Sequence, residues 1–224
     1  MTQDHESIER RPIASRNRKT SIRIARWLAN AGISPNFISL AGMFAGIGAG
    51  VAFAFTTQSE FRVFGFVLGA ILIQIRLLAN MFDGMVAIEA GKSSAIGELF
   101  NEVPDRVSDT SAFVGAGYAV ASNPILGFTA ACLAIFLAYI RAQGKVAGAH
   151  QEFCGPMAKP HRMFVLTVLA LYCGLAPLKW QPQVAVTELW GVMAWGLCFI
   201  ILGEVLTVFR RLWRIGRALG KSQS

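Results

Sequence analysis

Charged residues are scarce in this sequence. Asp, Glu, Lys and Arg make up 15% of its 224 residues, whereas a soluble domain of this size carries roughly a quarter. Cysteines are also few, and the four present (Cys132, Cys154, Cys173 and Cys198) are widely spaced and mostly lie in apolar stretches. This pattern argues against a disulfide framework and a zinc site. A cleavable signal peptide is not expected, because the first 20 residues are polar and charged.

Apolar residues form long uninterrupted runs. Hydrophobic residues make up 54% of the chain, and its mean hydropathy is +0.49. The stretch 35–55 contains no charged side chain, and as a helix it would span about 30 Å, the thickness of a bilayer's hydrocarbon core. The sequence therefore predicts an all-α integral membrane protein with six transmembrane helices. The predicted spans are about 35–56, 62–88, 96–121, 125–147, 161–178 and 186–208.

The basic residues predict the topology. The formal net charge is +8, and 17 of the 21 Lys and Arg residues fall on one side of a six-span arrangement. By the positive-inside rule both termini are cytoplasmic. The basic excess is then a signal for topology and for anionic membrane lipid, and we expect no nucleic-acid partner. The 17 residues are Arg10, Arg11, Arg16, Arg18, Lys19, Arg23, Arg26, Lys92, Arg141, Lys145, Lys159, Arg162, Arg210, Arg211, Arg214, Arg217 and Lys221.

The chain divides into three regions. Residues 1–34 form a cytoplasmic basic segment, and 19–31 mix Arg with Ile, Trp and Leu. This mixture predicts an N-terminal interfacial amphipathic helix on the cytoplasmic leaflet, with a flexible basic tail as the alternative. Ser34 followed by Pro35 fits an N-cap and first helical turn. Residues 35–210 form the six-helix membrane domain, and 211–224 form a basic cytoplasmic tail.

A cluster of polar side chains interrupts the second and third predicted spans. Such groups are costly at membrane depth, so they need a partner or a function. Asn80 and Asp83 share one helix face, while Asn101 and Asp105 follow a four-residue step on the next helix. A short break near 90–94 makes the two spans an antiparallel hairpin, so Asp83 and Asp105 lie at similar depth and can face each other.

Carboxylate and amide oxygens in such a cluster suit Mg²⁺, Mn²⁺ or Ca²⁺. The alternative is a purely structural hairpin, held by hydrogen bonds and by ion pairs such as Arg76 with Asp109. We favour structural pairing for Arg76, Arg106 and Asp109, and a functional role for Asp83 with Asp105.

The spacing of these residues resembles a motif of the CDP-alcohol phosphotransferase (CDP-alcohol phosphatidyltransferase) family, D-x2-D-G-x2-A-R-x8-G-x3-D-x3-D. Every spacing agrees here, and five of the eight fixed residues match: Asp83, Gly84, Ala87, Gly97 and Asp105. Three positions depart from the motif, namely Asn80, Ile88 and Asn101. The six-span layout, the basic N-terminal helix and the sequence from Tyr139 to Ala142 also resemble the family.

The resemblance implies a phospholipid-synthesis transferase that moves a phosphatidyl group from a CDP-alcohol to an acceptor alcohol and releases CMP. The donor would be CDP-diacylglycerol or another CDP-alcohol, and the acceptor a small hydroxylated molecule such as glycerol 3-phosphate. The expected cofactor is Mg²⁺ or Mn²⁺, one or two ions. A bacterial inner membrane is the expected location, and a homodimer is a candidate assembly because dimers are common in the family.

The resemblance also assigns roles to residues. Asp105 would be the catalytic base. Asp83, Asp105, Asn80 and Asn101 would hold metal, although each Asp-to-Asn departure removes a negative charge. Gly84, Ala87 and Gly97 would lie against the nucleotide. Apart from the resemblance, Arg141, Lys159 and Arg162 lie on the same side of the membrane as this site and would bind an acceptor phosphate; the alternative is that they only contribute to the positive charge of the cytoplasmic side.

Two other functions stay open on the sequence. A degenerate family member would bind lipid or nucleotide without turnover, as the two asparagines and Ile88 suggest. A small transporter would need a polar path through the full membrane thickness, whereas the ionisable residues crowd one hairpin.

Overall fold

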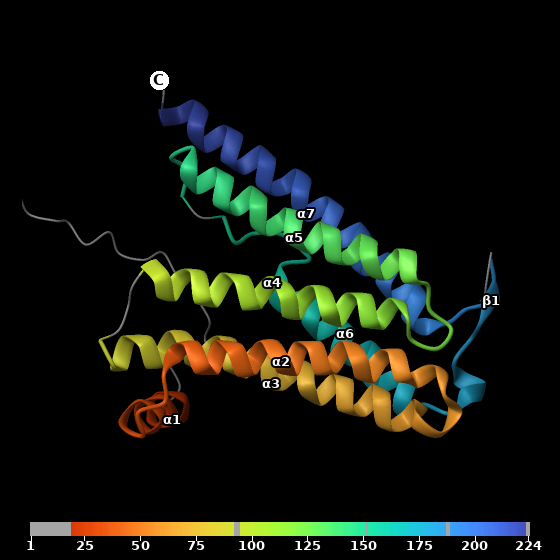
Figure 1. The fold of residues 1–224 in the computed structure, drawn as a ribbon. Coiled ribbons are helices and arrows are strands. Elements are labelled where there is room, and N and C mark those ends of the chain that lie inside the picture. The colour runs from red at the N-terminus through yellow and green to blue at the C-terminus, as the bar shows by residue number, and fades with distance from the viewer. Residues whose placement is uncertain (1–18, 92–94, 151, 187–188, 223–224) are drawn as a thin grey trace, which may run out of the picture.

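The computed structural model describes residues 19–91, 95–150, 152–186 and 189–222. Within them a short helix precedes six long ones, which run alongside one another in a bundle (Figure 1). The basic residues of the segment 1–18 and Lys92 lie outside the described residues. The helices are α1 (Lys19–Asn30), α2 (Pro35–Ala54), α3 (Arg62–Glu89), α4 (Ala95–Gly117), α5 (Pro124–Val146), α6 (Lys159–Leu175) and α7 (Val192–Ser222).

Short elements connect these helices. Three 3-10 turns, η2 (Phe55–Thr57), η3 (Ser59–Phe61) and η4 (Leu178–Trp180), lie between long helices, and β1 (Val184–Ala185) pairs antiparallel with β2 (Leu189–Trp190). This hairpin was not predicted. It occupies the start of the last predicted span, so α7 begins at Val192 instead of near 186 and continues past residue 210 without a break.

The ends of two helices follow from local sequence. The hydroxyl of Ser34 accepts a hydrogen bond from the backbone N–H of Phe37 at 3.2 Å, and Pro35 opens α2, as predicted. Asn123 caps α5 in the same manner, accepting from the N–H of Ile125 at 2.9 Å, with Pro124 as the first helical residue.

Four helical segments are long and apolar enough to cross a membrane among the residues that the structure describes: Pro35–Thr57, Ser59–Glu89, Pro124–Val146 and Val192–Gly220. The prediction of a helical integral membrane protein is confirmed at this level. The remaining two predicted spans correspond to α4 and α6, which do not qualify by composition and length alone. Charged residues crowd α4, and α6 has 17 residues.

The helix α2 organises the half of the bundle that carries the polar cluster. It packs extensively against both α3 and α4, whereas α3 and α4 contact each other much less. Glycines on one face of α2 permit this approach: a Cβ added at Gly42 would lie 2.8 Å from the Cβ of Ala79 on α3, and one at Gly46 would lie 2.8 Å from the Cα of Ser108 on α4. The helices α3 and α4 therefore both pack against α2, which leaves room between α3 and α4 for polar side chains.

The core is apolar and lies among all six long helices. Phe53, Phe66, Phe113, Leu166 and Leu197 are fully buried there. The helix α1 lies across one end of the bundle (Figure 1) and packs its Ala25 against the last turns of α3. Its Trp27 is 65% exposed, which is the arrangement expected of an amphipathic helix. All four cysteines are free.

Candidate active site

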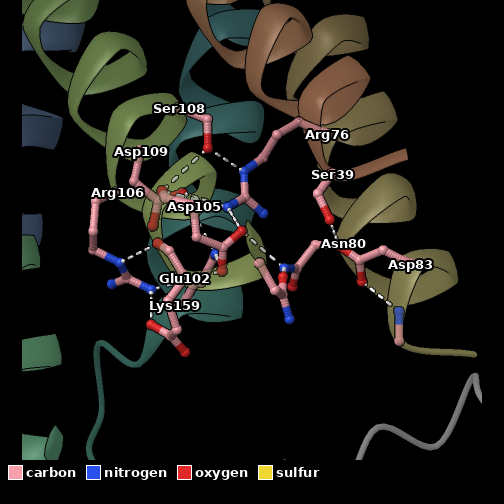
Figure 2. A network of polar contacts seen from close by, with 12 residues as sticks. Ser39, Arg76, Asn80, Asp83, Glu102, Asp105, Arg106, Ser108, Asp109 and Lys159 are labelled. Atoms are coloured by element: carbon pink, nitrogen blue, oxygen red, sulfur yellow. Dashed lines mark hydrogen bonds and ion pairs between the residues drawn. The ribbon is translucent and has the colours of Figure 1, made fainter. Parts of the chain in front are cut away.

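The residues of the motif come together at one end of the bundle. Asn80 and Asp83 project from the last turns of α3, and Asp105 from the first half of α4 (Figure 2). Asn101 lies one helical turn before Asp105 on α4. Asp83 and Asp105 line the same pocket, which has an empty volume of about 160 Å³. The residues that line it are Ser39, Gly42, Met43, Arg76, Asn80, Asp83, Pro104, Asp105 and Ser108.

Asp83 is buried and is held by neutral donors. One carboxylate oxygen accepts a hydrogen bond from the Ser39 hydroxyl at 2.7 Å, and the other accepts from the backbone N–H of Gly84 at 2.5 Å. Sequence reasoning missed Ser39, which is the one hydroxyl side chain in the apolar stretch 35–55. A hydroxyl group within a largely apolar span was the available signal.

Asp105 is bound on both oxygens by cationic or amide groups. Its Oδ1 accepts from the Arg76 guanidinium and, at 2.8 Å, from the Asn80 amide nitrogen. Its Oδ2 accepts from the Lys159 ammonium and lies 3.6 Å from the Arg106 guanidinium. Asp105 is therefore anchored to α3 and α6 by charge-assisted hydrogen bonds.

The two asparagines contact each other. The amide nitrogen of Asn80 donates to the Asn101 side-chain oxygen at 3.0 Å as well as to Asp105. Asn80 thus uses its donor group toward α4, which leaves its oxygen as a candidate metal ligand. The hairpin geometry predicted from the spacing of the motif brings these side chains together.

A second set of ion pairs lies deeper in the bundle. Asp109 contacts Arg76 at 3.1 Å and Arg162 at 2.9 Å, and Arg162 also contacts Glu204 on α7 at 3.4 Å. All four side chains are at most 3% exposed. The predicted pairing of Arg76 with Asp109 is confirmed. Sequence reasoning missed Glu204, the one acidic residue of α7, which lies in the apolar first half of that helix.

Each of the three residues predicted to bind an acceptor phosphate pairs with a carboxylate, and Lys159 and Arg162 share Asp109, at 3.7 and 2.9 Å. Arg141 pairs with Glu102 at 2.5 Å, Lys159 pairs with Asp105, and Arg162 is buried against Asp109 and Glu204. Glu102 also accepts from Arg106 at 3.1 Å, so one carboxylate bridges two arginines.

The small residues of the motif lie near the same end of the bundle. Gly84, Ala87 and Gly97 are half-buried, and none of them is among the described residues that line the pocket. Gly84 contributes through its backbone N–H to Asp83. The exposed side chain of Ile88 occupies the motif's arginine position.

The donor set limits the metal that this site fits. Among the described residues, no three His, Cys, Asp or Glu side chains gather closely enough to hold a metal ion. Two carboxylates and two amides of the motif remain, and both oxygens of Asp105 already face cations. This set offers oxygen donors for a divalent ion on the Asp83 side, where the carboxylate faces neutral donors.

The fold and the pocket define a helical integral membrane protein with a polar site at one end of its bundle. The chain belongs to the CDP-alcohol phosphatidyltransferase family, whose model matches residues 32–202. Relatives in this family are transferases of phospholipid synthesis.

The relatives are distant but extend over most of the chain. Phosphatidylinositol phosphate synthase of Mycobacterium tuberculosis is 25% identical over 88% of this chain and 86% of its own length. The synthase of Mycolicibacterium smegmatis is 28% identical over 75% of each chain. The inner membrane protein YnbA of Escherichia coli is 23% identical over 79% of this chain and 82% of its own.

Solved structures support the fold. Crystal structures of the Mycobacterium tuberculosis phosphatidylinositol phosphate synthase PgsA1, one with manganese and citrate and one with CDP-DAG bound, each match with a TM-score of 0.70 at 22% identity. The matches cover 87% of this chain and 88% and 92% of those chains, respectively. The resemblance predicted from the motif is thereby confirmed at the level of family and fold.

Proposed function

We propose that this protein transfers the phosphatidyl group of CDP-diacylglycerol to the hydroxyl of a phosphorylated polyol and releases CMP. The observation that carries the proposal is that Asp83 and Asp105, at the family's spacing, line one pocket at the end of the bundle. The relative with CDP-DAG bound supports the donor. The relatives' name, phosphatidylinositol phosphate synthase, favours an inositol phosphate acceptor over the expected glycerol 3-phosphate.

The proposed metal is Mg²⁺ or Mn²⁺, and the manganese complex of the relative supports this class of ion. Asp83 would be the principal ligand, with the amide oxygens of Asn80 and Asn101 and the edge of Asp105 beside it. When bound, such an ion would neutralise the pyrophosphate and the charge that develops on the departing CMP.

Asp105 is the proposed base. The acceptor's hydroxyl oxygen forms a bond to the phosphorus of the phosphatidyl group, the bond from that phosphorus to the CMP oxygen breaks, and the hydroxyl proton passes to Asp105. Arg76 and Lys159 fix the carboxylate in the pocket wall. Such positioning matters because a reacting group must lie within about 3–3.5 Å of its partner atom.

Other residues are proposed to bind the substrates. Gly84, Ala87 and Gly97 are small, which lets the nucleotide approach the backbone. For the acceptor phosphate we retain Arg141 and Lys159. The ion pairs of Arg162 with Asp109 and Glu204 bury it completely, so its role is structural.

The proposed membrane arrangement has six spans, α2 to α7, with both termini in the cytoplasm of a bacterial cell and the domain divisions predicted from the sequence. The site then lies at the inner leaflet, where the donor's acyl chains stay in the bilayer and the water-soluble acceptor enters from the cytosol. The basic helix α1 would rest on anionic headgroups through Arg23 and Arg26. A homodimer is also proposed from the family.

A second candidate function rests on the same side chains. Because Asn80 and Asn101 lack charge and Asp105 already has cationic partners, a member that binds nucleotide or lipid without turnover is the alternative.

Purified protein in lipid vesicles, given CDP-diacylglycerol, Mg²⁺ or Mn²⁺ and a panel of alcohols, tests the proposal. We expect CMP release with an inositol phosphate, its loss on adding EDTA, and its loss in Asp105→Ala. The exposed residue Lys145 provides the control, and Lys145→Gln should keep the wild-type rate. Absence of CMP release with every acceptor would favour the binding-only alternative.

A further inference from the structure

We propose that this site binds one divalent ion, at Asp83, and that the Lys159 ammonium occupies the position on the Asp105 side where a second ion would otherwise be needed. The proposal deepens the proposed function, since it concerns the same pocket. It assigns to Lys159, a proposed ligand of the acceptor phosphate, the further electrostatic task of an ion beside Asp105.

The first reason for the proposal is the burial and the positive charge around Asp105. The side chains of Lys159 and Asp105 are 14% and 13% exposed, and Arg76 is 3% exposed. Two full positive charges therefore contact one carboxylate with little water between them. A divalent ion brought to that carboxylate would be repelled by both cations, and this repulsion is strong where screening is weak.

The second reason is the orientation of the Asn80 side chain, which contacts Asn101 and Asp105. Asn80 turns its amide nitrogen, a donor, toward Asp105 at 2.8 Å and toward the oxygen of Asn101 at 3.0 Å. A direct hydrogen-bonded bridge thus joins positions 80, 101 and 105. An N–H group offers no lone pair to a metal, so this bridge replaces coordination on the α4 side.

A charge count carries the third step. Asp105, Asp109 and Glu204 together balance Arg76, Lys159 and Arg162, which pair with them in one connected network. Asp83, in contrast, is held by a hydroxyl and a backbone N–H, both neutral. Asp83 is therefore the carboxylate of the pocket that has no cation in direct contact. One divalent ion there would balance its negative charge.

The loop before α6 fixes Lys159 in place. The backbone N–H of Met157 donates to the Thr207 hydroxyl at 3.0 Å, and Arg211 donates to the carbonyl of Cys154 at 3.0 Å. Gly155 has a φ of 129°, and a Cβ there would lie 2.9 Å from the Cβ of Thr207. Since α7 holds this loop at several points, Lys159 reaches Asp105 from a rigid base.

Equilibrium binding of Mn²⁺ to the purified protein, followed by electron paramagnetic resonance, tests the proposal. We expect the wild type to bind one ion. The double variant Asn80→Asp, Asn101→Asp should bind a second ion only weakly, because Lys159 remains. Adding Lys159→Gln to the double variant should tighten the second site at least tenfold.

Two matched variants separate charge from structure. In the double-variant background, Lys159→Arg keeps the positive charge and should leave the second ion weak. In that background Lys145→Gln removes an exposed positive charge on the cytoplasmic side and should also leave the second ion weakly bound. Thermal unfolding in detergent checks that each variant is folded.

The outcomes for this inference and for the proposed function are distinct. A wild type that binds two Mn²⁺ ions with similar affinity, or none, overturns the inference, as does a triple variant whose second site is no tighter than that of the double variant. One bound ion without CMP release from any acceptor supports the inference and contradicts the proposed function. Two bound ions together with CMP release would contradict the inference and support the proposed function.

Discussion

The contact between α2 and α4 at Gly46 gives a quantitative prediction. In Gly46→Ala the new Cβ would lie 2.8 Å from the Cα of Ser108 and closer still to its Cβ, whereas ordinary contacts of this kind are 3.4–4 Å. The two backbones must therefore separate by about 1 Å, and overpacking of this kind costs roughly 1–3 kcal/mol. For a chain of this length that corresponds to a fall in Tm of roughly 2–12 °C.

The same separation should reduce activity. Ser108 accepts a hydrogen bond from Arg76 at 2.8 Å and lies one helical turn from Asp105. A displacement of about 1 Å at a reacting group can cost roughly 100-fold in rate, so we expect kcat for CMP release to fall between about tenfold and 100-fold.

Thermal unfolding in detergent and initial rates of CMP release measure both effects. Gly216→Ala is the matched control, because Gly216 lies in the helix α7 with nothing within 4 Å of a Cβ there. The control should keep its rate and gain up to about 2–4 °C in Tm, since Ala favours a helix over Gly by up to about 1 kcal/mol. A Gly46→Ala protein that matches the wild type in both Tm and rate would refute the proposed role of this contact.

Three further predictions concern the ion pairs and the topology. Arg162→Met leaves Asp109 and Glu204 buried with one cation fewer, so unfolding should be easier by about 3–5 kcal/mol; adding Glu204→Gln should recover part of the loss of Tm, and an unchanged Tm in the single variant would contradict the assignment. Glu102→Gln removes the negative charge that pairs with Arg141, which leaves Arg141 freer to bind the acceptor phosphate. Steady-state kinetics should therefore show a lower KM for a phosphorylated acceptor and an unchanged KM for CDP-diacylglycerol. Equal changes in both constants would argue against an acceptor site there. In a cysteine-free background, Lys179→Cys should react with a membrane-impermeant maleimide only from outside the cell, and labelling from the cytoplasmic side would exclude the six-span topology.

Local sequence patterns were sufficient to predict much of this fold. The apolar runs locate the long helices, and the pair Ser34-Pro35 marks the start of α2, because these features depend on neighbouring residues alone. The four-residue steps through Asn101 and Asp105 placed the motif on one helix face. This periodicity, with the short break before α4, was enough to bring Asp83 and Asp105 to one pocket.

Long-range contacts could not be predicted in the same way. Lys159 was interpreted as a topology charge and phosphate ligand, yet it contacts Asp105 from a different helix. Ser39 and Glu204 are polar residues within largely apolar stretches of helix, and the sequence does not show which neighbour each one contacts. Helix packing decides such partners, and here it depends on the glycines of α2 and on the loop that α7 holds.

The most direct test of whether Asp83 and Asp105 act in one site is the initial rate of CMP release. This rate should be compared among the wild type, Asp83→Asn, Asp105→Asn and the double variant. Both substitutions keep the shape of the side chain and remove its charge. If the two carboxylates act in one site, each single variant should lose at least about 100-fold in rate, and the double variant should be little worse than the poorer single one. A single variant that retains the wild-type rate would contradict the account.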